Sequence, residues 1–361
     1  MRVIAVVAGV VLIGGVLWEA FETLVLPRRV TRRLRFTRIY YRVFWSAWSS
    51  IGRPKPGTRR ENYLSIFGPL SLLLLLVLWV GGVIVGFAFV LWGLNTTLAP
   101  HGEGPFASHL YLSATTFVTL GIGDVTPASS PGRLVVAVEA GTGFAFLALT
   151  ISYLPVLYQA FSRREVSISM LDQWAGSPPS AVELLRRAAS HGSIASVEGL
   201  LADWERWSAD LLESHLSYPI LALFRSQHER QSWLAALTAI LDVSALVLAG
   251  IDGVPQWQAR RTFAISRHAV VDLAQVLGTP PDGTSSEAAR RADAEEVRRL
   301  LEAAGVDLGS RAVEHFEAFR RLYEPYVRAL SRRLEMPLPA LIPGDERRLD
   351  DWQQSAWEPP M

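Results

Sequence analysis

Residues 119–124 have the composition and spacing needed to bind a dehydrated cation. They read Thr-Leu-Gly-Ile-Gly-Asp, with Gly121 and Gly123 two positions apart. A cation that has lost its water needs a cage of oxygen atoms, and backbone carbonyls form one only where successive residues alternate in backbone hand. Glycine adopts the left-handed conformation at little cost. The carbonyls expected to line the cage belong to Thr119, Leu120, Gly121 and Ile122.

Two side chains in this stretch extend the same chemistry. The Thr119 hydroxyl would add a ring of ligands at the inner end, and the Asp124 carboxylate would concentrate cations at the outer mouth. One chain supplies one strand of the cage, whereas a closed ring needs four. Because the sequence holds a single copy of the stretch, it predicts a homotetramer.

The stretch and its context resemble the pore loop of the potassium channel superfamily, whose filter reads T-x-G-[aromatic or aliphatic]-G-D. Helix-like sequence at 106–118 precedes it, Pro127 follows it, and a long apolar segment flanks each side. The resemblance covers residues 62–164. It implies a bacterial two-span channel in the cell membrane, which conducts potassium ions passively and uses no cofactor.

Two positions depart from the pattern of that family. Ile122 stands where many members carry a tyrosine that ties the filter to the surrounding helix, and Val118 stands where a second threonine is common. Both changes leave the number of carbonyls unchanged, so potassium binding is still expected, while the stiffness of the filter is put in question. Thr115, in the pore helix, is included among the residues expected to support the filter.

The apolar segment at 134–161 is expected to be the inner helix of the pore. Its sequence EAGTG at 139–143 resembles the E-A-x-x-G of inner helices in bacterial two-span channels. A carboxylate at this depth is costly, so Glu139 should face the pore helix as a brace, hydrogen-bonded or protonated. Gly143 and Pro155 are expected bending points for an inner gate, and close helix packing is the alternative role of Gly143.

The composition indicates a membrane part joined to a soluble part. The chain has 361 residues, 50% of them hydrophobic, and a mean hydropathy of +0.23. It has no cysteine, which excludes disulfides and thiolate metal sites. We expect spans at 3–26, 64–94 and 134–161, with the pore helix at 106–118 re-entering the membrane.

The basic residues set the expected orientation. They cluster at 28–42, 53–60 and 163–164, all on one side of the expected spans. This pattern places the amino terminus and the filter mouth outside and the carboxyl half in the cytoplasm. Arginines recur every third residue at 29–38, as in a voltage sensor, but only one span precedes them. We therefore expect residues 34–51 to lie along the membrane surface.

The second half of the sequence predicts an all-helical cytoplasmic domain. It is acidic, which argues against nucleic-acid binding, and it lacks the βαβ pattern and glycine turn of a nucleotide-binding domain. The amphipathic runs lie at 180–191, 194–230, 231–250, 258–278, 286–304 and 309–335. Residues 233–250 are apolar enough to span a membrane, but the central Asp242 and the polar flanks favour a buried core helix.

Several polar residues stand in these otherwise apolar helices. His268 and Asp272 are four residues apart and share a helical face, a spacing that suits a metal or a pH-sensitive pair. A satisfied core hydrogen-bond network is the alternative, and no metal site is predicted. The residues of this candidate effector pocket are His215, His228, Asp242, His268 and Asp272. The chain carries no recognised catalytic motif, so we expect it not to be an enzyme.

The sequence thus predicts an all-α membrane protein with a tetrameric pore-loop fold, an additional amino-terminal span and a helical soluble domain. The expected divisions are 1–60, 61–164 and 165–361, with the last part gating the inner helix. Two other functions stay open: a weakly selective cation channel, and a non-conducting membrane-anchored sensor or scaffold. A transporter subunit is a further alternative, although such chains usually repeat the pore loop four times.

Overall fold

Helices make up 76% of the computed structural model and strands almost none of it, which confirms the all-α membrane protein that the sequence predicts. The residues described are 1–26, 35–55, 57–100, 102–227, 230–283 and 286–342. The chain divides into two compact units. The first unit is Met1–Ile51 with Pro69–Tyr158, and the second is Gly52–Gly68 with Gln159–Met361.

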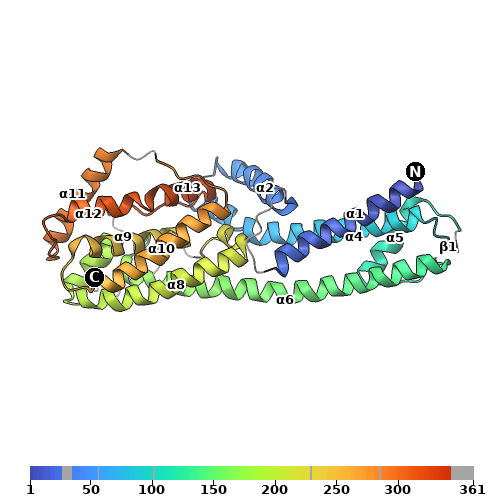
Figure 1. Ribbon diagram of the computed structural model, residues 1–361, viewed down its shortest axis with the longest axis horizontal. Coiled ribbons are helices and arrows are strands. Elements are labelled where there is room, and N and C mark those ends of the chain that lie inside the picture. The colour runs from blue at the N-terminus through green and yellow to red at the C-terminus, as the bar shows by residue number, and fades with distance from the viewer. Residues whose placement is uncertain (27–34, 56, 101, 228–229, 284–285, 343–361) are drawn as a thin grey trace. The chain divides into compact units, whose positions relative to one another are not determined.

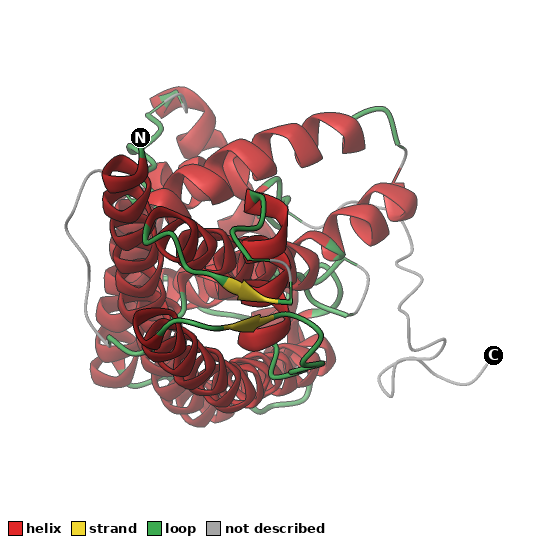
Figure 2. Ribbon diagram, turned by 90° about the vertical axis from the view of Figure 1, so that its right-hand side faces the viewer, coloured by secondary structure: helices red, strands yellow, loops and turns green. Residues whose placement is uncertain are grey.

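The first unit contains the helices that the sequence predicts to span the membrane, and the expected pore loop. Its helices, labelled in Figure 1, are α1 (Arg2–Leu24), α2 (Phe36–Gly52), α4 (Phe67–Gly93), α5 (Phe106–Phe117) and the part of α6 (Ser130–Ala175) that ends at Tyr158. The strands β1 (Leu98–Ala99) and β2 (Thr126–Pro127) pair antiparallel, Leu98 opposite Pro127, and are drawn in yellow in Figure 2. This short pairing, which the sequence did not predict, joins the segments before and after the pore loop.

Glycine allows α1 and α4 to pack with their backbones in close contact. A Cβ atom at Gly9 would lie 2.5 Å from the carbonyl oxygen of Gly86, and one at Gly93 would lie 2.7 Å from that of Arg2. Small residues let membrane helices approach closely enough for dispersion forces to hold them together. Ala5 and Gly9, two small residues of α1, are both buried.

Two carboxylates fasten α2 to the end of α1. The Glu19 carboxylate accepts hydrogen bonds from the backbone amides of Phe36 and Thr37, at 3.1 and 3.3 Å, and so caps the first turn of α2. Glu22 lies 3.5 Å from Arg35. Among the described residues, this is the arginine that pairs with a carboxylate at the end of α1. The arginines at 28–33 lie outside the described residues.

The helical part of the second unit surrounds α9 (Trp233–Gly250). Every residue of α9 except Gly250 is buried within the structure, which favours a core helix over a further span. Its neighbours are α7 (Ala181–Ser190), α8 (Val197–Ser217), α10 (Gln256–Val276), α12 (Ala312–Arg321) and α13 (Glu324–Leu334). The remaining elements are α3 (Gly57–Ser65), η1 (Ile194–Ser196), η2 (Pro219–Leu223) and α11 (Glu287–Ala303).

Serine hydroxyls begin three of these helices. Ser180, Ser232 and Ser286 precede α7, α9 and α11, and each accepts a hydrogen bond from the amide three residues later, at 3.4, 3.0 and 3.1 Å. Such a cap satisfies an amide that has no partner inside the helix. These starts agree with the amphipathic runs expected at 180–191, 231–250 and 286–304.

Three helix boundaries differ from the expected ones. The run at 194–230 ends as an α-helix at Ser217, because Pro219 has no N–H and begins the short η2 helix. The run at 309–335 separates into α12 and α13, and Pro325 stands in the first turn of α13. The inner helix does not end at 161: α6 continues to Ala175, because Arg163 and Arg164 carry charge without interrupting helical hydrogen bonding.

The Gly9→Leu variant tests the packing of α1 on α4. We expect the free energy of unfolding to fall by about 1–3 kcal/mol, because the new side chain overlaps the backbone at Gly86. Gly14→Leu is the matched control, since a Cβ there meets nothing within 4 Å. Thermal unfolding of the purified protein in detergent measures both. Equal destabilisation by the two variants would contradict the close contact.

Candidate functional site

The pore helix α5 holds the backbone amides of the stretch that follows it. The Thr119 amide donates to the carbonyl oxygen of Thr116 at 2.9 Å, and the amides of Leu120 and Gly121 both donate to that of Thr115 at 2.8 and 3.2 Å. The Thr115 hydroxyl also donates to carbonyls one turn back in α5. Thr115, expected as a support residue, therefore binds the stretch through its main chain.

The backbone of this stretch alternates in hand. Thr119, Gly121 and Gly123 have φ angles of +56°, +53° and +83°, whereas Leu120 and Ile122 between them do not have positive φ. Glycine adopts these angles readily, but a β-branched residue does so only under strain of order 1–3 kcal/mol. The sequence predicts the two glycines, and the structure adds Thr119 as a third left-handed position.

This alternation frees the carbonyl groups of the stretch. The amides of Thr119, Leu120 and Gly121 are bound to α5, while within the described residues the carbonyls at 119–122 accept no hydrogen bond. Oxygen atoms without a hydrogen-bond donor can coordinate a cation in place of water. The structure thus brings the expected ligand residues together in one strand of the kind that a carbonyl cage needs.

Asp124 is tied to the pore helix by a tyrosine. The hydroxyl of Tyr111 donates to one oxygen of Asp124 at 3.0 Å, and the other oxygen accepts the amide of Val125 at 3.0 Å. Sequence reasoning missed Tyr111. A signal in the sequence could have found it. Ile122 has no hydroxyl with which to tie this stretch to the neighbouring helix, and Tyr111, in the middle of the expected pore helix, offers one.

Glu139 lies against the pore helix and is completely buried. Its carboxyl group is hydrogen-bonded to the hydroxyl of Ser113, which also lies 2.7 Å from the carbonyl oxygen of Ile84. One hydroxyl has a single hydrogen and cannot donate to both oxygens. A neutral carboxylic acid satisfies both contacts, because Glu139 then donates to Ser113 while Ser113 donates to Ile84.

Comparison with known proteins agrees with this geometry. Residues 72–159 match the family described as Ion channel. This segment is an ion-channel domain. The chain is also similar to the uncharacterized membrane protein YdjJ of Bacillus subtilis (strain 168), with 26% identity over 206 residues that cover 55% of this chain and 58% of the relative. The chain therefore matches less than two thirds of that relative's length, and no solved structure matches the chain significantly.

Gly143 of the ion-channel domain is a close-packing position. A Cβ atom there would overlap the carbonyl oxygen of Phe117 and lie 3.1 Å from its Cα. The last turn of α5 therefore rests directly on the backbone of α6. Pro155, the other expected bending point, lies inside α6, which continues through it. The geometry gives Gly143 the packing role that the sequence allows as an alternative.

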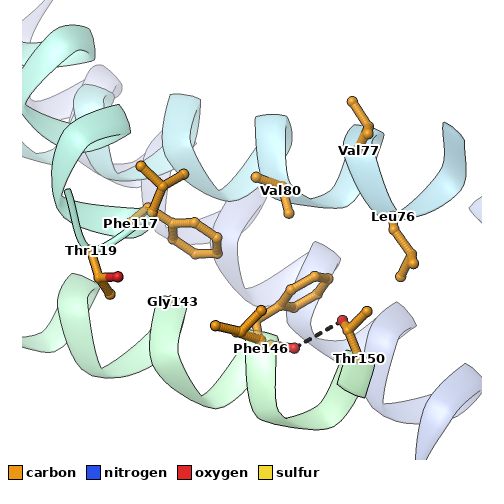
Figure 3. A pocket seen from close by; sticks show the side chains of 10 residues that line it. Leu76, Val77, Val80, Phe117, Thr119, Gly143, Phe146 and Thr150 are labelled. Atoms are coloured by element: carbon orange, nitrogen blue, oxygen red, sulfur yellow. Dashed lines mark hydrogen bonds between the residues drawn. The ribbon is translucent and has the colours of Figure 1, made fainter. Parts of the chain in front are cut away.

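An apolar pocket adjoins Thr119, at the beginning of the stretch 119–124, in the ion-channel domain. It has a volume of about 340 Å³ and lies between α4, the end of α5 and α6, with Thr119 and Gly143 close together and Leu76 and Thr150 further along (Figure 3). Thr150 turns its hydroxyl to the carbonyl oxygen of Phe146, at 2.9 Å. The pocket walls are therefore almost wholly hydrocarbon.

The candidate effector residues of the helical part have separate partners. His215 is buried and contacts Arg164, whereas Asp242 accepts a hydrogen bond from the hydroxyl of Tyr323. His268 lies 3.3 Å from Asp272.

His228 lies outside the described residues. Within the described part of the chain, no three His, Asp or Glu side chains are grouped to hold a metal ion. Of the candidate residues, the structure brings His268 and Asp272 together, which is the pair that sequence spacing predicts.

The Gly143→Ala variant tests the contact between α6 and the pore helix. We expect it to reduce ionic current sharply and to destabilise the protein by about 1–3 kcal/mol, because the methyl group displaces Phe117 at the base of the filter. Gly141→Ala is the matched control, since a Cβ at that position of the same helix meets nothing within 4 Å. Bilayer current and thermal unfolding measure the two effects. Normal current in Gly143→Ala protein would contradict the packing role.

Proposed function

We propose that four copies of this chain form a potassium-selective channel that conducts potassium ions passively across the membrane. The observation that carries the proposal is the alternating backbone of residues 119–123, with positive φ at every second residue and carbonyls that accept no hydrogen bond among the described residues. The match of residues 72–159 to the ion-channel family supports it. An ion-channel domain also accords with the expectation that the chain is not an enzyme.

The side chains of the filter support a tetramer. Val118, Leu120 and Ile122 are 56%, 62% and 58% exposed in the single chain. If the carbonyls point to a central axis, these apolar side chains point away from it, where adjacent copies would cover them. A single strand offers a cation only one side of a cage, so four copies also complete the coordination.

The selectivity for potassium over sodium depends on how rigidly the surrounding residues hold the filter. Val118 and Ile122 bring no polar atom to the surrounding helix, which favours the weakly selective cation channel as a second candidate. The Tyr111–Asp124 hydrogen bond and the two amide bonds to Thr115 oppose it, because they fix both ends of the strand. These contacts favour potassium selectivity.

The protein is multi-pass in a membrane, since α1, α4 and α6 are each long and apolar enough to cross one. For its orientation we propose the amino terminus and filter mouth outside and the helical part in the cytoplasm, from the basic clusters. In this arrangement residues 1–60, 61–164 and 165–361 act as amino-terminal anchor, pore and cytoplasmic regulator.

The regulator would act on the inner helix through Arg164. This side chain is buried, and its guanidinium donates to the carbonyl oxygens of Leu221 and Phe224 at 2.9 and 2.8 Å. It also lies 3.2 Å from a ring nitrogen of His215. Burial, followed by the charge of Arg164, holds the pKa of His215 well below its usual range, so the imidazole stays neutral and accepts.

The same segment of chain also contacts the beginning of the first pore span. The ring of Phe224 would lie 2.7 Å from a Cβ at Gly68, and Arg225 forms an ion pair with Glu61 of α3. Residues 219–225 thus contact the start of α4 and the extension of α6 together. We call them the connector, and we propose that movements of the helical part reach the gate through it.

The reversal potential tests the proposed selectivity. Purified protein in a planar bilayer, with potassium on one side and sodium on the other, should reverse near the potassium equilibrium potential. Gly121→Ala should abolish that current, because alanine resists the φ of +53° even though its methyl group meets no neighbour. Current that reverses near zero would establish the weakly selective channel instead. A tetramer without current under any condition would favour the scaffold.

The Arg164→Gln variant tests the connector. It removes charged donors from two buried carbonyls, each bond being worth about 1.5–3 kcal/mol. We therefore expect open probability to change about ten-fold or more, with unitary conductance and reversal potential unchanged. Arg206→Gln, which loses the same charge at a position with 79% exposure, is the control. Single-channel recording separates the two, and equal open probability in both variants would contradict coupling through Arg164.

A further inference from the structure

A pocket with both charged and apolar walls precedes the first pore span. It has a volume of about 480 Å³ and is formed by the turn after α2 and by α3. The side chains that line it are Pro54, Lys55, Arg59, Asn62, Tyr63 and Ile66. Its chemistry is unlike that of the pocket beside the filter, because cations and an amide stand at one end.

The acidic groups near this pocket are already engaged elsewhere. Glu335 pairs with Arg60 at 2.5 Å and lies 3.9 Å from Arg53. Glu61 pairs with the buried Arg225. Among the described residues, no carboxylate pairs with Lys55 or Arg59, so the two cations on the pocket wall are not neutralised.

The pocket changes from charged to apolar toward the membrane span. Arg59, Tyr63 and Ile66 follow one another at spacings of four and three residues, so they share one face of this helical segment. Ile66 is 52% exposed and immediately precedes α4. At 1.5 Å per residue, Arg59 lies about 10 Å along the helix from Ile66, which is comparable with the depth of the polar headgroup layer of a bilayer.

We propose that this pocket binds the headgroup of an anionic phospholipid. Lys55 and Arg59 would contact the phosphate, with the arginine able to donate two parallel hydrogen bonds. Asn62 would bond to ester or headgroup oxygens, while Tyr63 and Ile66 contact the first carbons of the acyl chains. The Lys55 ammonium already lies 4.8 Å from the centre of the Tyr63 ring, which holds the cation at the pocket wall.

A lipid is favoured over a soluble phosphate because of Ile66. A free phosphate would use the cations alone and leave the exposed isoleucine without a role, whereas a phospholipid uses both ends of the pocket. The proposal does not depend on ion conduction, so lipid binding and channel activity fail or succeed separately.

Lipid binding to the full-length protein tests the proposal. Native mass spectrometry should show that the purified protein retains dioleoylphosphatidylglycerol in preference to dioleoylphosphatidylcholine. The double variant Lys55→Gln/Arg59→Gln should bind phosphatidylglycerol about thirty-fold more weakly, from the loss of two juxtamembrane cations. Lys55→Arg/Arg59→Lys, which keeps both charges, should retain most of the binding.

The control is Arg291→Gln/Arg299→Gln, which removes two charges from exposed arginines of α11. If this control weakens phosphatidylglycerol binding as much as the pocket variant does, the effect is one of net charge and the proposed site is wrong. Inorganic phosphate should displace the lipid from wild-type protein only at concentrations well above those of the lipid. Displacement at equal concentration would overturn the lipid assignment in favour of a soluble anion.

Discussion

The last turn of α5 decides the conformation of residues 119–121, on which the proposed filter depends. Thr115 accepts the amides of Leu120 and Gly121 through one carbonyl oxygen, and this contact turns the following strand so that its own carbonyls stay unbonded. The same turn packs on α6 at Gly143, because the backbone of Phe117 occupies the space that a side chain at position 143 would need. One polar contact, at Thr115, and one steric contact, at Gly143, thus fix the last turn of α5.

The remaining buried polar groups of the first unit serve this placement. Ser113, one turn before the end of the pore helix, contacts both Glu139 of α6 and the main chain of α4. A polar group in such surroundings is costly unless it finds a partner, so the three elements are favoured in a single relative position. The apolar contacts among Trp79, Phe117 and Phe146 supply bulk stabilisation but little directional preference.

The sequence predicted those features that follow from the residue type or the segment length alone. Gly121 and Gly123 indicate left-handed backbone because few other residues adopt it cheaply, and long apolar segments indicate spans because a bilayer has a fixed thickness. Sequence reasoning missed the left-handed backbone of Thr119 and the role of Tyr111, since a threonine at positive φ and a hydroxyl aimed at Asp124 depend on contacts made by the folded chain. The connector escaped notice for the same reason: Arg164 resembles an ordinary membrane-flanking arginine until its burial is known.

The glycine contacts between α1 and α4 also determine which surface of each of these helices stays uncovered in the chain. One face of α4 is covered by α1, and the outward side of α1 presents Val3, Ile4, Val7 and Val11 to its surroundings. A change in bilayer thickness would therefore act first on α1, by altering its tilt. Such a mechanical input would reach α4 and α5 through the backbone contacts at Gly9, Gly86 and Gly93 and through the α1 side chains Ile13, Val16 and Leu17, so α1 would stand between the bilayer and the rest of the unit.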